Sequence, residues 1–452
     1  MSSPYFDAFD YKKLSAEYPT GEGFISRYSG MSRQTLEDIQ QERFKSVLEC
    51  AWDTPLYRSL WLESGIQPSD ITDLSDITKL PIIDKSVILA DIEAHPPFGS
   101  LPTRIQKSVT QRVLQTTSGT TGNPQPVLWG PWGREVQNAL LGRTYTWLGV
   151  NSSDVMHSVY GHGLVNGGHY IREAATRYTE ALMLTAGTGI ETRSERQVAV
   201  MSQFGVTVLV GFADYLMKLS QVARDSDLVP GTDIPVRMII GHVLDGGREA
   251  LEKAWGGAKV YNWYGVADTG IVATEGPERD GMHVWEDANF LEIISSDESG
   301  DQMGDMVVTS LGKNDLAPLI RFNTHDLTAL HTSRSSEFPF QKIIGLLGRS
   351  DNMVKLKGIN VYPTAIGGML QSVSTFTGEY VCRAENINGI ETLTVVIEVT
   401  NNPESLHEEV KQVLAQKLGV TVEIELVAPG QTAELTGLNT RQKPARLLDL
   451  RK

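Results

Sequence analysis

A turn rich in glycine and hydroxyl side chains, enclosed by two strand-like runs, constrains this chain more than any other stretch. Residues 115–124 read QTTSGTTGNP, with Val113 and Leu114 before them and the run VLW at 127–129 after them. Glycine lets a backbone turn tightly and approach a ligand closely. Hydroxyls and successive N–H groups form a concave surface that suits phosphate. The stretch lacks the lysine of the G-x-x-x-x-G-K-[ST] loop, and by itself such a composition is more often an ordinary turn.

Size and charge exclude several classes of protein. A chain of 452 residues is too long for one core and predicts two or three domains. With 55 acidic and 40 basic residues the net charge is −15, which argues against broad binding of nucleic acid or of an anionic membrane. Cys50 and Cys382 are too far apart in sequence for a CxxC pair and fit a reducing compartment. The sequence has no signal-peptide pattern and no run long enough for a membrane span, so we expect a cytoplasmic protein.

Apolar periodicity predicts mixed α/β layers. Apolar residues in 33–51 are spaced for one helical face, and residues 70–81 are typical of short turns and caps. From about 105 to 330, helical patterns alternate with strand-like runs, including 206–210 and 236–240.

The last hundred residues have a different pattern. Residues 393–399 and 420–426 alternate between apolar and mostly polar residues, and a helical pattern covers 403–419 between them. This predicts a small β-α-β domain, joined through the glycine-containing segment 345–351. A compact domain on such a connection is expected to move relative to the larger part.

Three further segments carry candidate binding residues. Residues 160–169 (YGHGLVNGGH) match no common metal-ligand spacing and are predicted to be a pocket-lining loop. Residues 262–268 (NWYGVAD) offer aromatic rings that could stack on a purine and an aspartate that could hold Mg²⁺. Asp326 is suited to accept hydrogen bonds from a ribose. Taken singly, these residues also fit core packing, a cap and a solvated turn.

Seven segments stand in a characteristic order. They are SGTTG (118–122), YGHG (160–163), GMHVWED (281–287), PLIRF (318–322), GRSD (348–351), KGINVYP (357–363) and KPARLLD (443–449). Their order and spacing resemble the adenylate-forming superfamily of acyl-CoA synthetases, and within it the phenylacetate-CoA ligase group. The resemblance implies an α/β fold with a large multi-layer N-terminal adenylation domain (1–348) and a small mobile α+β C-terminal lid domain (349–452), with the hinge near Asp351.

The resemblance also implies an activity. A carboxylic acid is activated with ATP as an acyl-adenylate, pyrophosphate is released, and the acyl group passes to coenzyme A. It implies Thr120, Lys443 and Asp268 as catalytic residues, with Asp268 also the Mg²⁺ ligand. The implied ATP-binding residues are Ser118, Gly119, Thr120, Thr121, Gly122, Gly241, His242, Asn262, Trp263, Tyr264, Asp326 and Arg349. The implied acid-binding residues are Tyr160, His162, Gly163, Phe212, Gly265, Val266 and Ala267.

Departures from the family pattern refine these expectations. Asn123 replaces the usual lysine of the phosphate turn, so we expect weaker ATP binding. Asp268 stands where the family usually has glutamate, so the metal contact could pass through water or fall to Glu275. The cysteines that some relatives carry are absent, and no zinc is predicted.

Aromatic walls predict an aryl or arylacetic acid, with His162 and Asp214 available to pair with a polar substituent. The final acceptor stays open between coenzyme A, a carrier protein, an amine and a small nucleophile such as nitrite. A catalytically silent ATP-binding relative and a homodimer also stay open.

Overall fold

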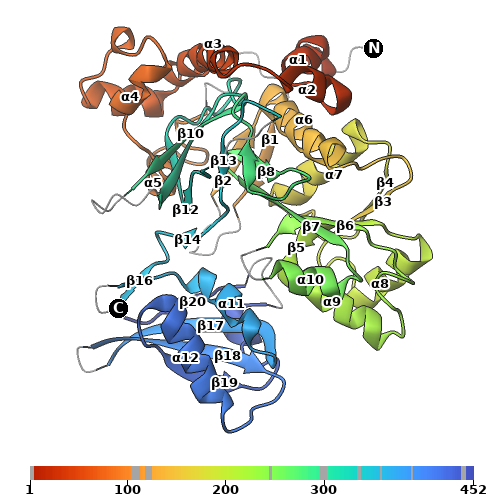
Figure 1. The fold of residues 1–452 in the computed structure, drawn as a ribbon. Coiled ribbons are helices and arrows are strands. Elements are labelled where there is room, and N and C mark those ends of the chain that lie inside the picture. Colours follow the sequence, from red (N-terminus) through yellow and green to blue (C-terminus); the bar gives the residue numbers. More distant parts are fainter. Residues whose placement is uncertain are drawn as a thin grey trace.

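The computed structural model describes residues 5–102, 112–117, 125–243, 247–295, 303–332, 337–356, 359–387, 390–438 and 444–451. The predicted mixed α/β class is confirmed: the described residues contain both helices and strands, and the strands form several sheets (Figure 1). Among the helices of these ranges, none combines the length and apolar character that crossing a membrane requires.

Helices from the N-terminus cover one end of the molecule (Figure 1). Their bounds are α1 Tyr11–Glu17, α2 Gly21–Tyr28, α3 Arg33–Trp52, α4 Pro55–Glu63 and α5 Lys85–Ala94. The helix predicted over 33–51 is α3, which begins where the Ser32 side chain accepts a hydrogen bond from the Thr35 backbone. The turns predicted over 70–81 include the short 3₁₀ helices Pro68–Asp70 and Leu74–Lys79, both with capping boxes.

An eight-stranded sheet forms the centre of the larger part, in the order β13-β9-β8-β7-β6-β5-β3-β4. The strands are β3 Val155–Ser158, β4 Leu182–Thr185, β5 Val208–Phe212, β6 Met238–His242, β7 Lys259–Val266, β8 Gly270–Glu275, β9 Met282–Val284 and β13 Lys342–Ile343. From β4 to β7 all pairings are parallel, and beyond β7 they are antiparallel. Its helices are α6 Pro131–Trp147, α7 Gly167–Tyr178, α8 Ser194–Gln203, α9 Ala213–Asp225 and α10 Arg248–Ala254.

A second sheet and a hairpin complete this part. The antiparallel sheet has the order β10-β11-β12-β14, with bounds β10 Asn289–Ile294, β11 Met303–Ser310, β12 Phe322–Ala329 and β14 Gly348–Arg349. The runs predicted as strands on both sides of the glycine-rich turn are β1 Val113–Thr116 and β2 Pro126–Trp129, which pair antiparallel. Buried side chains of α3 and α4 pack on the segment that leads into β12.

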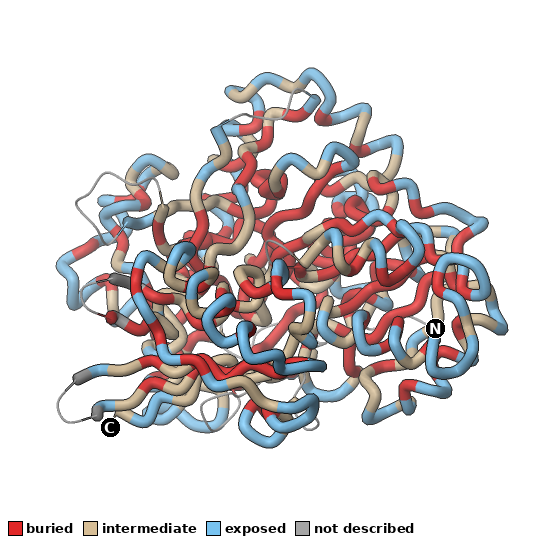
Figure 2. Tube along the Cα trace, turned by 60° about the horizontal axis from the view of Figure 1, so that its bottom comes forward, coloured by how far each residue is buried: buried red, intermediate tan, exposed pale blue. Residues whose placement is uncertain are grey.

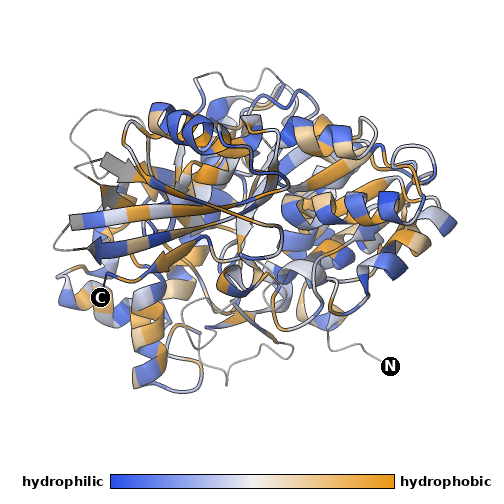
Figure 3. Ribbon diagram, turned by 90° about the horizontal axis from the view of Figure 1, so that it is seen from below, coloured by the Kyte–Doolittle hydropathy of each residue, from blue (hydrophilic) through white to orange (hydrophobic). Residues whose placement is uncertain are grey.

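The last hundred residues build their own hydrophobic core, with buried members from Val354 to Ile424 (Figure 2). The elements are β15 Val354–Leu356, β16 Ile359–Val361, α11 Ile366–Met369, β17 Phe376–Ile387, β18 Ile390–Val399, α12 Leu406–Leu418, β19 Glu423–Val427, α13 Ala433–Thr436 and β20 Leu447–Asp449. Helix α12 ends at Gly419, whose φ of 70° suits glycine. Figure 3 shows hydrophobic and hydrophilic residues interspersed along this part, as expected where one face of each element is buried. The exact domain boundary stays a prediction.

Candidate functional site

Several of the predicted site residues lie at the carboxyl ends of parallel strands. Tyr160 follows β3, Phe212 ends β5 and His242 ends β6. Phe212 lies opposite His242, and Gly241 lies opposite Asn262 on β7. In open α/β sheets, ligands bind in the crevice outside these strand ends. The sheet topology therefore brings together residues that are 102 positions apart in sequence.

These strand ends form a cluster of aromatic rings. Tyr160 and Phe212 have ring centroids 4.6 Å apart, Phe212 stacks on His242 at 5.5 Å, and His242 lies 4.5 Å from Trp263. Tyr160 and Trp263 are buried. The cluster joins two residues predicted to bind the acid with two predicted to bind ATP.

The segment over 160–169 differs from the predicted loop, because helix α7 begins at Gly167. A Cβ at Gly168 would lie 2.2 Å from the carbonyl oxygen of Gly161, so helix packing alone requires glycine there. The His169 ring bonds to the carbonyl oxygen of Gly163 at 2.8 Å. Burial lowers the pKa of His162, so that imidazole is neutral at pH 7.

A chain of polar side chains, here called the cleft network, links the two sheets. The Tyr264 hydroxyl donates to Asp326 at 2.7 Å, and Arg349 donates to the other oxygen of Asp326 at 3.1 Å. Arg349 also donates to both carboxylate oxygens of Asp351, at 2.8 and 2.6 Å. Pairing of β12 with β14 places Asp326 opposite Arg349. The predicted base, ribose and hinge residues therefore lie in one continuous network.

Two residues predicted to meet the adenine are engaged within the protein. The Tyr264 side chain is 2% exposed, and burial followed by the charge of Asp326 raises its pKa well above the usual value. The Asn262 carboxamide accepts from the backbone N–H of Val243 at 2.8 Å and donates to its carbonyl oxygen at 3.0 Å. Stacking on Tyr264 and recognition by Asn262 stay predictions.

Asp268 lies in the turn between β7 and β8, directly after Gly265, Val266 and Ala267. One carboxylate oxygen accepts from the Gln125 side chain at 2.7 Å, and burial raises the pKa of Asp268. Mg²⁺ is commonly held by one or two carboxylates together with phosphates and water, so the hard carboxylate oxygens of Asp268 fit that role.

Glu275, the alternative ligand, fits a metal less well. Its carboxylate accepts from Arg248 at 2.5 Å and from the backbone N–H of Asn262 at 2.8 Å. Within the described ranges, no group of three or more His, Cys, Asp or Glu side chains is arranged to hold a metal.

Two lysines near Asp268 were not predicted from the sequence. Lys85, at the start of α5, places its Nζ 3.5 Å from the Thr117 hydroxyl, next to the phosphate turn. Lys313 is buried, donates to the carbonyl oxygen of Asp268 at 3.0 Å and lies 4.2 Å from the centre of the Trp129 ring. Burial lowers the pKa of Lys313 to about 8. Both lysines are far from Asp268 in sequence, so only the fold identifies them.

The predicted site residues that lie outside the described ranges are Ser118, Gly119, Thr120, Thr121, Gly122 and Lys443.

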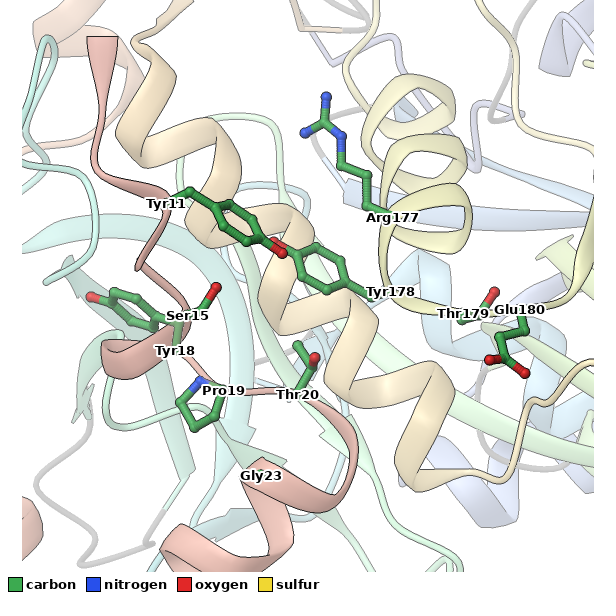
Figure 4. A pocket seen from close by; sticks show the side chains of 10 residues that line it. All are labelled: Tyr11, Ser15, Tyr18, Pro19, Thr20, Gly23, Arg177, Tyr178, Thr179 and Glu180. Atoms are coloured by element: carbon green, nitrogen blue, oxygen red, sulfur yellow. The ribbon is translucent and has the colours of Figure 1, made fainter. Parts of the chain in front are cut away.

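A cavity of about 510 Å³ lies away from the strand ends, between α1, α2 and the end of α7 (Figure 4). Its lining includes Tyr11, Tyr18 and Tyr178 and none of the predicted site residues.

Comparisons with known proteins find relatives over most of this chain. The family described as AMP-binding enzyme C-terminal domain matches residues 358–451. The phenylacetate-coenzyme A ligase of Thermus thermophilus is 28% identical, over 93% of this chain and 98% of its own length. The enzyme of the same name from Pseudomonas putida is 27% identical, over 88% of this chain and 92% of its own.

The fold matches a solved ligase in more than one state. A crystal structure of 2-hydroxyisobutyryl-CoA ligase in the postadenylation state gives a TM-score of 0.81, at 24% identity and with 94% of this chain and 91% of that chain covered. The same ligase in the thioesterification state gives 0.66, with 94% and 92% covered. Because the protein and the coverage are nearly the same, the difference reflects arrangement, and this chain is closer to the postadenylation arrangement. Together these matches show that the chain is similar to phenylacetate-coenzyme A ligases over most of its length and has the fold of a solved CoA ligase.

Proposed function

We propose that this chain is an AMP-forming acid–thiol ligase that acts on a small aromatic carboxylic acid. A carboxylate oxygen attacks the α-phosphorus of ATP, the bond to the bridging oxygen breaks, and pyrophosphate leaves. The thiol of coenzyme A then attacks the acyl carbon and AMP leaves. The named activity of the curated relatives supports this reaction.

The cleft network is the observation that supports nucleotide binding most directly. Asp326 is held between Tyr264 and Arg349 at 2.7 and 3.1 Å. A carboxylate is an acceptor group and suits the two donor hydroxyls of a ribose. We assign Asp326 to the ribose, and Tyr264 and Asn262 to the base.

Adenylation requires that two anions meet, so the chain has to neutralise charge and align the reactants. Asp268 would hold Mg²⁺, which neutralises phosphate charge when bound. The phosphate turn has Asn123 where the family usually has a lysine, and Lys85 would supply the missing positive charge. Lys443 would reach the α-phosphate and the carboxylate, and Lys443→Ala should slow adenylate formation by roughly 10²–10³-fold.

The aromatic cluster supports an aromatic acid. Tyr160, Phe212, His242 and Trp263 present ring walls at the strand ends, and flat rings pack well against such walls. A short hydroxyalkyl acid is the second candidate, because the solved structure with the TM-score of 0.81 is a 2-hydroxyisobutyryl-CoA ligase.

Pyrophosphate release tests this proposal. The enzyme with ATP and Mg²⁺ is given phenylacetate, 2-aminobenzoate or 2-hydroxyisobutyrate, each with and without coenzyme A. Release that depends on phenylacetate or 2-aminobenzoate, with a thioester formed only when coenzyme A is present, supports the proposal. Pyrophosphate release that occurs with 2-hydroxyisobutyrate but with neither aromatic acid favours the second candidate. Adenylate without thioester would indicate another acceptor, and no release with any acid would indicate a silent relative.

A further inference from the structure

Arg446 connects the C-terminal part of the chain to the larger part. One guanidinium nitrogen donates to Glu379 and to the carbonyl oxygen of Tyr380, both at 2.8 Å, and the group lies 4.6 Å from the centre of the Tyr380 ring. The other terminal nitrogen donates to Asp214 at 2.9 Å. Glu379 and Tyr380 belong to the same part as Arg446, whereas Asp214 belongs to the larger part.

Asp214 lies at a position that couples the acid site to this contact. It is in the first turn of α9, which begins directly after Phe212 at the end of β5. A helix N-terminus favours a negative side chain. The sequence offers Asp214 as a polar group available to pair with a substituent of the acid, and in the structure its carboxylate pairs with Arg446.

The two ends of this ion pair differ in burial. The Arg446 side chain is 9% exposed, and the Asp214 side chain is 50% exposed. The Glu379 and Tyr380 partners of Arg446 lie in the same part of the chain as Arg446 itself. The bond to Asp214 is therefore the replaceable one, since water can take its place and half-exposed ion pairs are weak.

Arg446 lies close in sequence to Lys443, and this suggests what the ion pair with Asp214 does. Arg446 follows Lys443 by three residues, and the chain has the arrangement that is closer to the postadenylation state of a solved ligase. We propose that Asp214 is a positioning residue for the first half-reaction: it holds Arg446, three residues after Lys443, in the arrangement that resembles the postadenylation state, and it releases Arg446 for thioester formation. This inference rests on the proposed function.

Separate assays of the two half-reactions test the inference. Asp214→Asn should slow pyrophosphate release from ATP and phenylacetate by roughly three- to tenfold through kcat, with the KM for phenylacetate unchanged. It should leave thioester formation from preformed phenylacetyl-adenylate and coenzyme A unchanged or faster. Asp214→Glu should recover part of the loss. Glu195→Gln, in the first turn of α8, is the matched control and should behave as wild type. Equal slowing of both half-reactions, or of neither, would overturn the inference.

A readout without turnover separates this inference from the proposed function. If the wild-type protein activates no acid, the proposed function fails. The ion pair between Asp214 and Arg446 still predicts a change in amide hydrogen exchange when it is removed. Asp214→Asn should then increase amide exchange in residues 213–217 and 379–383, at an unchanged melting temperature, and Glu195→Gln should not. Identical exchange in Asp214→Asn and wild type would show that the contact holds nothing in place.

Discussion

Asp287 and Asp326 each accept a hydrogen bond from a tyrosine hydroxyl at 2.7 Å. Each also accepts one from an arginine, at 3.0 Å from Arg143 and 3.1 Å from Arg349. Their surroundings differ. The Arg143 and Asp287 side chains are fully buried, whereas Arg349 is 34% and Asp326 11% exposed. The same arrangement of aspartate, tyrosine and arginine is therefore fully buried around Asp287 and partly exposed around Asp326.

The described contacts of the buried Arg143 side chain are all with other residues of the protein. Arg143 donates to the carbonyl oxygen of Pro19 and lies over the rings of Phe24, Tyr28 and Trp285. These contacts tie the N-terminal helices to the large sheet. The cleft network instead continues to Asp351, which is 42% exposed. We therefore expect the fully buried aspartate to stabilise the fold and the partly exposed one to contact a ligand.

The largest expected effect lies in the closed cluster. Asp287→Asn leaves the charges of Arg143 and Arg43 buried without their carboxylate, so we expect a loss of roughly 3–5 kcal/mol of unfolding free energy. Urea unfolding followed by circular dichroism measures it. A loss below about 1 kcal/mol would show that the cluster does not stabilise the fold.

The second-largest expected effect is a loss of unfolding free energy at acid pH, caused by the buried His283. Burial, with a smaller contribution from Lys342, lowers the pKa of His283 from 6.5 to about 4. The unfolded chain therefore binds the proton more readily, and stability present above pH 6.5 is lost as the pH falls towards 4, by up to about 3 kcal/mol. Urea unfolding between pH 7.5 and 4.5 should show a shallower pH dependence for His283→Gln, and His407→Gln, at a side chain that is 46% exposed, serves as the control. An unchanged slope in His283→Gln would contradict the assignment.

The matched substitution in the cleft network should act on binding rather than on folding. Asp326→Asn should raise the KM for ATP by roughly 10- to 100-fold, because a hydrogen bond to a charged group contributes about 1.5–3 kcal/mol. Its unfolding free energy should change by less than that of Asp287→Asn. Initial rates of pyrophosphate release against ATP concentration measure the first quantity. An unchanged KM, or a loss of stability as large as that of Asp287→Asn, would remove the distinction between the two aspartates.

The smallest effect concerns Lys85. Removing one positive charge beside solvated phosphates costs about 1 kcal/mol, so Lys85→Met should raise the KM for ATP by roughly fivefold without changing stability. The effect should shrink at high salt. Lys79→Met, at an exposed lysine paired with Asp76, is the control and should leave the KM unchanged. A Lys85 variant that matches this control would exclude a role at the phosphates.

Local patterns and motif order predicted much of this molecule. Apolar spacing predicted α3 and α12, and the order of short motifs indicated the family. Contacts between distant residues could not be predicted in this way. Whether Lys313 is buried depends on Trp129 and Asp268, which come from other elements, and Asp214 meets a partner 232 residues away.

The enclosed ring of Tyr264 shows the same limit. Aromatic character alone suggests a stacking surface, whereas exposure is set by the strands that cover the ring. The polar partners of Tyr264 and Asn262 were likewise not evident from their own segment, since the partner residues lie on other strands and turns.

A crystal structure with a non-hydrolysable ATP analogue tests the central claim most directly, namely that the residues of the cleft network bind the nucleotide. We predict the ribose hydroxyls within hydrogen-bonding distance of Asp326 and the base against Tyr264. A nucleotide bound elsewhere, with Asp326 still bonded to protein side chains alone, would contradict the account.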